Sequence, residues 1–317
     1  MSRVDNPAVE NPAVENPAVD NTASGALDGV LDPVPSPGAP RIRGLRRLRV
    51  WPWSLRVGLF GVLAVVLVLL ATPWSAPFDP ALQDLSNRLA PPSGAHWLGT
   101  DQLGRDVLSR LMWGGRFSVT IAAITLTISA VFGTLLGIVC ARSKGALDEF
   151  VMRVSDVLLA FPEMIVAMFL VSILGAGYGT LILALAVAGW TPFARLARAL
   201  TLEINSRDFI EAAESLGFSR TFIILRHLLP NAFSPLLAHA SVRFGHTLIT
   251  VGALSFLGLG VAPPDSDWGS MLADGLPYMS RAAGLVIYPG LAIFLTALAV
   301  TLTGRGINVR PRRQGRG

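Results

Sequence analysis

The chain has 317 residues, of which 52% are hydrophobic and 15% are charged, and its mean hydropathy is +0.54. Long apolar runs with so few charges exclude a soluble globular domain and indicate an integral membrane protein. The net charge of +5 does not indicate a nucleic-acid partner, because the arginines cluster beside the apolar runs rather than on one polar face. The expected surroundings are a lipid bilayer.

Two rare residues exclude whole classes of site. The one lysine, Lys144, is followed by Gly145, whereas a phosphate-binding loop needs a lysine followed by serine or threonine. The chain therefore carries no ATP site of that kind. The one cysteine, Cys140, excludes an intrachain disulfide and a cysteine metal cluster, and we expect it to fill the core.

Residues 1–50 are predicted to be a disordered cytoplasmic tail. A five-residue repeat begins at Asn6, Asn11 and Asn16, and the Gly- and Pro-rich sequence after it cannot bury a core. A basic run then precedes the first apolar segment: Arg41, Arg43, Arg46, Arg47 and Arg49. This run places the N-terminus in the cytoplasm. The polar lead is far longer than the basic region of a signal peptide, which favours an uncleaved first span.

Six apolar segments are long enough, or nearly so, to cross a hydrocarbon core of about 30 Å. They cover residues 57–71, 119–140, 154–174, 181–199, 232–259 and 285–303. Arginines in the connections place both termini and the fourth connection in the cytoplasm. We predict an all-α membrane protein with a first transmembrane helix at 51–76, an extracytoplasmic loop at 77–117, five further spans within 118–304 and a basic cytoplasmic tail at 305–317.

Residues 208–230 interrupt the apolar pattern and are typical of a docking element for another protein. Asp208 and Glu211 have the spacing of a capping box, and Ala213 contributes to a small-residue face that a partner could approach closely. Gly217 is expected to end this helix and Ser219 to cap a second one. The alternative is an ordinary helix-turn-helix connection. The candidate docking residues are Asp208, Glu211, Ala212, Ala213, Leu216, Gly217, Ser219, Leu229 and Pro230.

Three motifs together resemble one family. They are EAA at 211–213 with Gly217 and LP at 229–230; HWLGTD at 96–101 with GRDVLSR at 104–110 and GR at 115–116; and LSFLGLG at 254–260, continuing through PP at 263–264 to DWG at 267–269. This set resembles the integral membrane permease subunits of ATP-binding-cassette importers. The second and third motifs place the resemblance in the dipeptide, oligopeptide and nickel branch, in its C-type subunit.

The resemblance implies a type I importer permease fold with six transmembrane helices and a cytoplasmic coupling helix, in a bacterial plasma membrane. It implies one half of a translocation path, completed by a second, non-identical permease. Two cytoplasmic ATP-binding subunits would hold ATP and Mg, and an extracytoplasmic solute-binding protein would deliver the substrate. The docking residues would then couple ATP hydrolysis to transport. No cofactor, metal or catalytic residue is expected in this chain.

Two departures from the family pattern concern single residues. Val251, Gly252 and Ala253 stand where related permeases often place a glutamate, and residues 304–308 lack the expected aspartates. The residues leave the substrate open among dipeptides, longer peptides, nickel chelates and haem.

Charged groups inside apolar segments are the candidate pathway residues, because charges at membrane depth usually face a bundle interior or a cavity. Asp156 and Glu163 lie seven residues apart beside Pro162, and we expect them on one helical face. His239, Arg243 and His246 have a similar spacing in the fifth span. Arg243 could meet a peptide carboxylate, or it could pair with Glu163 between helices. A metal site is disfavoured, since nothing fixes the geometry of these groups.

The extracytoplasmic motifs suggest two further elements. Arg105, Asp106 and Arg110 lie opposite apolar residues, which predicts an amphipathic segment along the membrane surface or a cap for the second span. Trp268 is expected in an external lid or an interface anchor.

Two other functional classes compete. An ion-coupled secondary transporter also suits six spans with buried charges, but the halves show no convincing internal repeat, and the polar insert stays unexplained. A membrane-embedded enzyme is disfavoured because the sequence has no paired-histidine motif and no nucleophile elbow.

Overall fold

A computed structural model describes residues 52–143 and 145–308. The helices are α1 (Trp53–Ser75), α2 (Val107–Ser143), α3 (Ala146–Ala160), α4 (Glu163–Leu174), α5 (Tyr178–Gly189), α6 (Thr191–Asn205), α7 (Asp208–Ser215), α8 (Arg220–Ile223), α9 (Leu229–Phe256), α10 (Trp268–Gly275) and α11 (Gly284–Asn308). Within the described ranges the chain is helical and has no named strand. The predicted N-terminal tail and most of the C-terminal tail lie outside the described residues.

Four described segments are long and apolar enough to cross a membrane: α1, α2, α5 together with α6, and α11. The pair α3 and α4 would make a fifth if counted as one span. At 28 residues α9 is also long enough, but it is not among these segments. The all-α, multi-pass class is therefore confirmed, whereas the number of six spans stays a prediction.

The third predicted span is not a straight helix. The axes of α3 and α4 meet at 91°, at Phe161 and Pro162. Proline fixes its own φ, lacks an N–H donor and disfavours helical geometry in the residue before it, so the helix ends at Ala160 and restarts at Glu163. The expectation that Asp156 and Glu163 share one helical face was therefore wrong.

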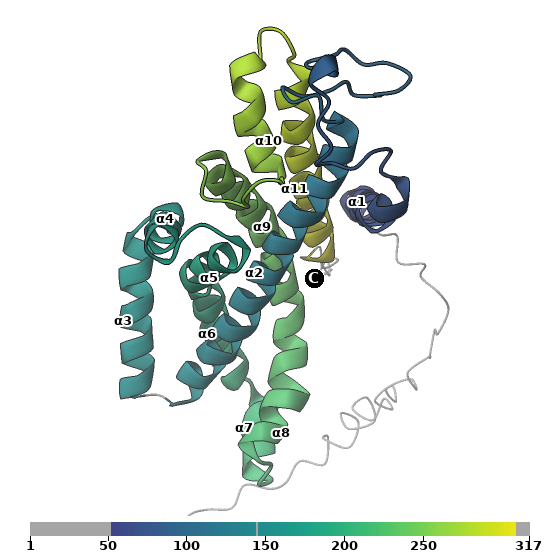
Figure 1. The fold of residues 1–317 in the computed structure, drawn as a ribbon. Helices are drawn as coiled ribbons and strands as arrows, with labels where there is room; N and C mark the ends of the chain where they lie inside the picture. The colour runs from purple at the N-terminus through teal and green to yellow at the C-terminus, as the bar shows by residue number, and fades with distance from the viewer. Residues whose placement is uncertain (1–51, 144, 309–317) are drawn as a thin grey trace, which may run out of the picture. The chain divides into compact units, whose positions relative to one another are not determined.

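The helix α2 is the longest in the described chain, at 37 residues, and Figure 1 shows it running past α5, α6 and α9. It begins at Val107, twelve residues before the predicted start at 119. At 1.5 Å per residue its length is about 55 Å, which exceeds the bilayer core. It contacts most of the other helices, including α1, α3, α10 and α11.

Small residues let α2 and α6 approach each other closely. Gly133 lies against the carbonyl of Trp190, and Gly137 lies against the backbone of Ala194. A β-carbon at either glycine would overlap those backbone atoms. Cys140 is buried nearby in a cluster with Val151, Trp190 and Ala194, which confirms its predicted place in the core.

Replacing Gly137 with alanine should destabilise the protein, because the new methyl group meets rigid backbone of α6. Overpacking of this kind costs about 1–3 kcal/mol, which exceeds the gain of up to about 1 kcal/mol from alanine's helix propensity. Gly179→Ala is the matched control, since Gly179 is also helical and has nothing within 4 Å of its β position. Thermal unfolding in detergent should show a lower midpoint for Gly137→Ala only. Equal midpoints would contradict the packing argument.

Candidate functional site

The polar insert folds as two helical pieces joined by a glycine elbow. Gly217 has φ +79°, and the N–H of Phe218 donates to the carbonyl of Ala213 at 3.2 Å. This is the bond that closes a helix end on a left-handed residue. The hydroxyl of Ser219 accepts from the N–H of Phe222 at 3.3 Å, so Ser219 caps the second piece. The predicted elbow and the predicted second cap are both confirmed.

The predicted capping box is not present. Asp208 is already inside α7, and the N–H of Ile210 donates to the carbonyl of Arg207 at 2.9 Å. In the part of the chain that the structure describes, neither Asp208 nor Glu211 makes a side-chain hydrogen bond to the backbone of the other. The helix starts one residue early, which leaves both carboxylates in its first turn, where the helix dipole favours negative charge.

The small-residue face was also placed wrongly. Ala213 is only 6% exposed and packs in a cluster with Ile204, Ile210, Ile223 and Ala232. Helical periodicity shows which residues share a face, but it does not show whether that face meets a partner or the chain's own core. The small residue at 213 therefore fixes α7 against the rest of this chain.

The exposed face of the insert is apolar instead. We name this surface the apolar tip; it consists of Phe209, Leu216, Phe218, Phe222 and Leu225. Leu216 is 77% exposed, and the rings of Phe218 and Phe222 stack with their centroids 4.8 Å apart. Of these five residues, only Leu216 was predicted from the sequence as a docking residue. The available signal was three phenylalanines in a short stretch that also carries several charged residues.

The insert joins α9 without a loop. A π-helical turn at Ile224–Leu228 connects α8 to α9, and the N–H of Leu229 donates to the carbonyl of Ile224. Pro230 has no N–H, and its ring would clash with a carbonyl one turn earlier, so the helix widens there rather than ending. The amide of Asn231 donates to the carbonyl of His227 at 2.6 Å. Pro230 therefore lies inside a continuous helical path, whereas a new segment was expected to start there.

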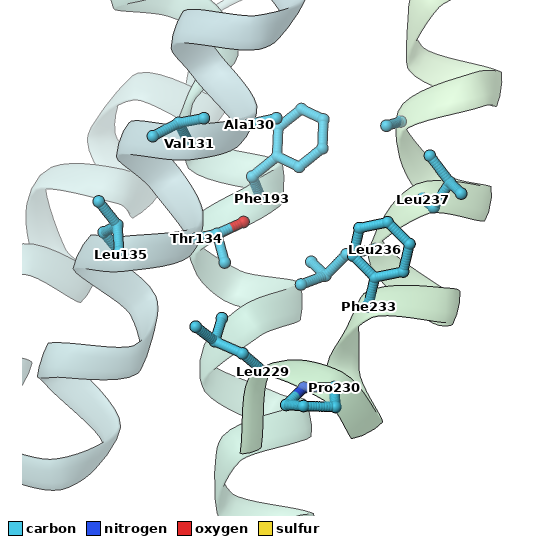
Figure 2. Close-up of a pocket in the computed structure, with 11 residues that line it drawn as sticks. Ala130, Val131, Thr134, Leu135, Phe193, Leu229, Pro230, Phe233, Leu236 and Leu237 are labelled. Atoms are coloured by element: carbon cyan, nitrogen blue, oxygen red, sulfur yellow. The ribbon is translucent and has the colours of Figure 1, made fainter. Parts of the chain in front are cut away.

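An apolar groove of about 550 Å³ runs between α2, α6 and α9. Figure 2 shows Phe233, Leu236 and Leu237 of α9 on one side, α2 on the other, and Phe193 of α6 between them. The groove begins at the insert, because Leu229 and Pro230 also line it. The remaining lining residues are Ala130, Val131, Thr134, Leu135 and Ala240.

A charged cluster lies one turn beyond the groove on α9. The Nη2 of Arg243 donates to Oε2 of Glu163 at 2.7 Å, and Nδ1 of His246 lies 3.8 Å from the same oxygen. Both partners are largely enclosed, with side chains 15% and 17% exposed. The structure thus forms the interhelical pair that was one of the two alternatives for Arg243. It is made across the bend, because Glu163 is the first residue of α4.

The other two candidate pathway residues lie differently. His239 packs edge-to-face on Phe193, a residue that lines the groove, with ring centroids 5.0 Å apart. Asp156 pairs with Arg195 of α6 instead, and both side chains are about half exposed. The structure therefore gathers Glu163, His239, Arg243 and His246 and leaves Asp156 apart.

The motif at residues 96–110 folds into a buried ion network rather than a surface helix. Asp101 accepts from Nε of Arg105 at 2.7 Å and also pairs with Arg110, and Arg110 reaches Asp274 at 3.0 Å. The three residues predicted to lie on an amphipathic surface segment, Arg105, Asp106 and Arg110, are all buried. Asp106 accepts from the N–H of Ser109 at 2.8 Å, which caps α2. The cap alternative is confirmed, and the surface-lying amphipathic segment is ruled out because its charges are internal.

Trp268 is part of the core and not an exposed lid or anchor. It is buried, its backbone N–H donates to Ser118, and its indole N–H donates to the carbonyl of Leu111 at 2.8 Å. Asp267 caps α10 in a capping box with Ser270. Burial raises the pKa of Asp267, and hydrogen bonds from the backbone of residues 269 and 270 oppose that shift. This end of the bundle is therefore a packed scaffold.

Known proteins are similar to this chain over most of its length. A family model described as binding-protein-dependent transport system inner membrane component matches residues 133–311, more than half of the chain. The chain is 40% identical over 263 residues to a protein of Escherichia coli (strain 536) named glutathione transport system permease protein GsiD, covering 83% of this chain and 86% of that protein. The protein of the same name in Pectobacterium atrosepticum is 38% identical over 255 residues, 80% and 84% of the two chains.

The chain belongs to this permease family. As a permease subunit of an ATP-binding-cassette transport system, it is a multi-pass component of the inner membrane and not an enzyme. ATP hydrolysis takes place in partner ATPases, and a separate binding protein serves the system.

The fold agrees with this membership. One chain in an inward-facing structure of the MetNI methionine ABC transporter matches the permease with a TM-score of 0.52 at 19% identity. The match covers 62% of this permease and 94% of the other chain. At this identity the likeness concerns the fold, which is the type I permease fold that the sequence predicted.

Replacing Asp101 with asparagine should strongly destabilise the permease. The substitution keeps an acceptor for the N–H groups of Leu103 and Arg105 but removes the buried one of the two carboxylates that pair with both guanidinium groups, leaving only the half-exposed Asp274. Breaking a buried pair in this way costs about 3–5 kcal/mol. Asp274→Asn is the control: its side chain is 40% exposed, and the expected loss is about 1 kcal/mol or less. Similar thermal midpoints for the two variants would show that the network is not needed for stability.

Proposed function

We propose that this permease subunit imports short peptides and that its insert at 208–230 is the docking site for a cytoplasmic ATPase. The observation that carries the proposal is the apolar tip, five large side chains that this chain leaves uncovered on a polar insert. Exposed apolar groups gathered beside Asp208 and Glu211 are typical of a protein-binding surface with a polar rim. The insert forms one end of the bundle in Figure 1, where a soluble partner can reach it.

Docking there would move the translocation path directly. The helical path from α8 through the π-helical turn into α9 contains no flexible loop, so a displacement of the tip moves α9. Arg243 lies fourteen residues after Leu229, about 21 Å along that helix. The proposed role of the coupling residues is therefore positional. Ala213 and Gly217 hold the tip at a fixed angle to α9, and the phenylalanines with Leu216 and Leu225 make the contact.

The proposed assembly has one copy of this chain, a second, non-identical permease, two ATPases and a solute-binding protein. The proposed orientation places the insert and both termini in the cytoplasm. Two contacts support that orientation. Leu55, near the start of α1, packs on Gly306, near the end of α11, and Arg142 at the end of α2 lies beside Asn205, just before the insert. Arg56 and Arg305 accompany the first contact, in keeping with the positive-inside pattern.

The proposed cargo is a short peptide because of the relatives' printed names. They are called glutathione transport permeases, and glutathione is a tripeptide. The groove and the charged cluster suit such a cargo, since they offer apolar contact for side chains and charged groups for termini. Nickel chelates and haem are the alternatives within the family, and an ion-coupled carrier is the alternative outside it.

Changing Leu216 to aspartate should release the ATPase without unfolding the permease. The side chain is exposed, so the fold loses little, whereas an apolar contact at the centre of an interface is worth a tenfold change in affinity or more, by order of magnitude. Leu85→Asp is the matched control, because Leu85 is also exposed, at 64%, and lies in the loop before α2. ATPase recovered with the purified permease should fall on the order of tenfold for Leu216→Asp only. Equal recovery with both variants would remove the tip from the docking surface.

Uptake into vesicles tests the cargo. The complete importer, with ATP enclosed and its binding protein outside, is offered labelled glutathione, trialanine, nickel and haem in turn. ATP-dependent accumulation of a peptide is expected. Uptake of nickel or haem alone would refute the peptide assignment. Uptake driven by an ion gradient without ATP would favour the carrier.

A further inference from the structure

We propose that Arg243 binds the C-terminal carboxylate of the transported peptide and that Glu163 holds this guanidinium when no peptide is present. This inference rests on the proposed function, because it assumes a peptide cargo. It assigns a ligand group to one residue of the charged cluster. It also gives the ion pair a role beyond holding two helices together.

The guanidinium group of Arg243 has more N–H donors than it uses in its bond to Glu163. Its Nη2 donates to Glu163, while its Nε is buried and has no hydrogen-bond partner within residues 52–143 and 145–308. A guanidinium group offers five N–H donors in a planar fork, and that fork matches the two oxygens of a carboxylate. An arginine whose role was only to pair with one glutamate could use a two-bond geometry, as Arg198 does with both oxygens of Asp148 at 2.7 Å.

The pair can be reached from one side. His246, beside it on α9, has a side chain that is 54% exposed, and Val242 and Ile249 continue the exposed strip one turn on either side. On the same helix Ala240 closes the apolar groove one turn before Arg243. A peptide that enters from the side opposite the insert and lies along α9 therefore meets the guanidinium first and the apolar walls next.

Exchange of carboxylates makes such a site reversible. An arginine enclosed among helices without an anion is costly, so Glu163 neutralises it in the empty state. An arriving carboxylate takes the place of Glu163 at the guanidinium, so Arg243 keeps one directly paired anion. The displaced Glu163 keeps two favourable neighbours. His246 lies 3.8 Å from its Oε2 atom, and the N-terminal end of α4, whose first turn contains Glu163, favours negative charge. The site can therefore bind the peptide and also release it.

The competing explanation is an ion pair that only joins α4 to α9. The two explanations differ in what reversing the charges should do. A purely structural pair works in either order, so Glu163→Arg combined with Arg243→Glu should restore whatever the single variants lose. A carboxylate site needs its cation at position 243, so the reversed pair should repel the peptide terminus.

The test uses the complete importer in vesicles with its binding protein at saturating concentration. Capture of the peptide by the binding protein then does not limit the rate of uptake. The probes are glutathione and trialanine, each as the free acid and as the C-terminal amide, and the readout is the ratio of the two uptake rates. The variants are Arg243→Gln, Arg243→Lys and the reversed pair. The control reverses Asp148 and Arg198, an α3–α6 ion pair away from the cluster.

Wild-type protein and the Asp148/Arg198 control should favour the free acid on the order of tenfold, the size of a charge-assisted hydrogen bond. Arg243→Gln should abolish the preference, Arg243→Lys should keep part of it, and the reversed pair should not regain it. An unchanged ratio in Arg243→Gln, no preference in the wild type, or recovery in the reversed pair would each overturn the inference and leave the peptide function standing. If the wild type takes up no peptide at all, the proposed function fails and the inference fails with it.

Discussion

The close contact between α2 and α6 is the constraint on which the rest of the structure depends. Gly133 and Gly137 bring two backbones together where any side chain would hold them apart. One turn earlier Ser129 faces Gly189, and the carboxylate of Glu163 lies beside that same glycine. The floor of the apolar groove and the position of Glu163 are therefore both set by how near α6 and the end of α5 can come to α2.

The ion network around Asp101 fixes the first turns of α2. Enclosed ion pairs rarely add net stability, because removing the charges from water offsets much of their attraction. Their effect is on geometry: Asp101 accepts from two arginines and from two backbone N–H groups, so the loop can approach α2 in only one way. Asp274 of α10 joins the same network and ties the last part of the bundle to the first. A long helix held at its start and along its middle can serve as a fixed frame for α9.

The sequence was sufficient to predict those structural features whose physical cause is local. The elbow at Gly217, the cap at Ser219 and the multi-pass helical class follow from backbone preference and composition, and all were predicted. The pairing of Glu163 with Arg243 was predicted as one of two alternatives because isolated charges in apolar segments seek each other.

The errors share a different cause. Ala213, Arg105 and Trp268 were placed on the wrong side of their elements, since periodicity defines a face without telling what covers it. The bend at Pro162 was underestimated because some membrane helices tolerate proline, and only the packing around α4 decides between a kink and a break. That break matters for function. A straight helix would carry Glu163 onward with Asp156 toward Arg195. The 91° turn instead brings Glu163 to Arg243 of α9. The helix α9 continues without interruption to the apolar tip. The proline thereby places Glu163, the counter-ion of the proposed cargo site, on α4. In the proposed mechanism the ATPase moves α9, which carries Arg243. A shift of α9 therefore changes the distance between Arg243 and Glu163.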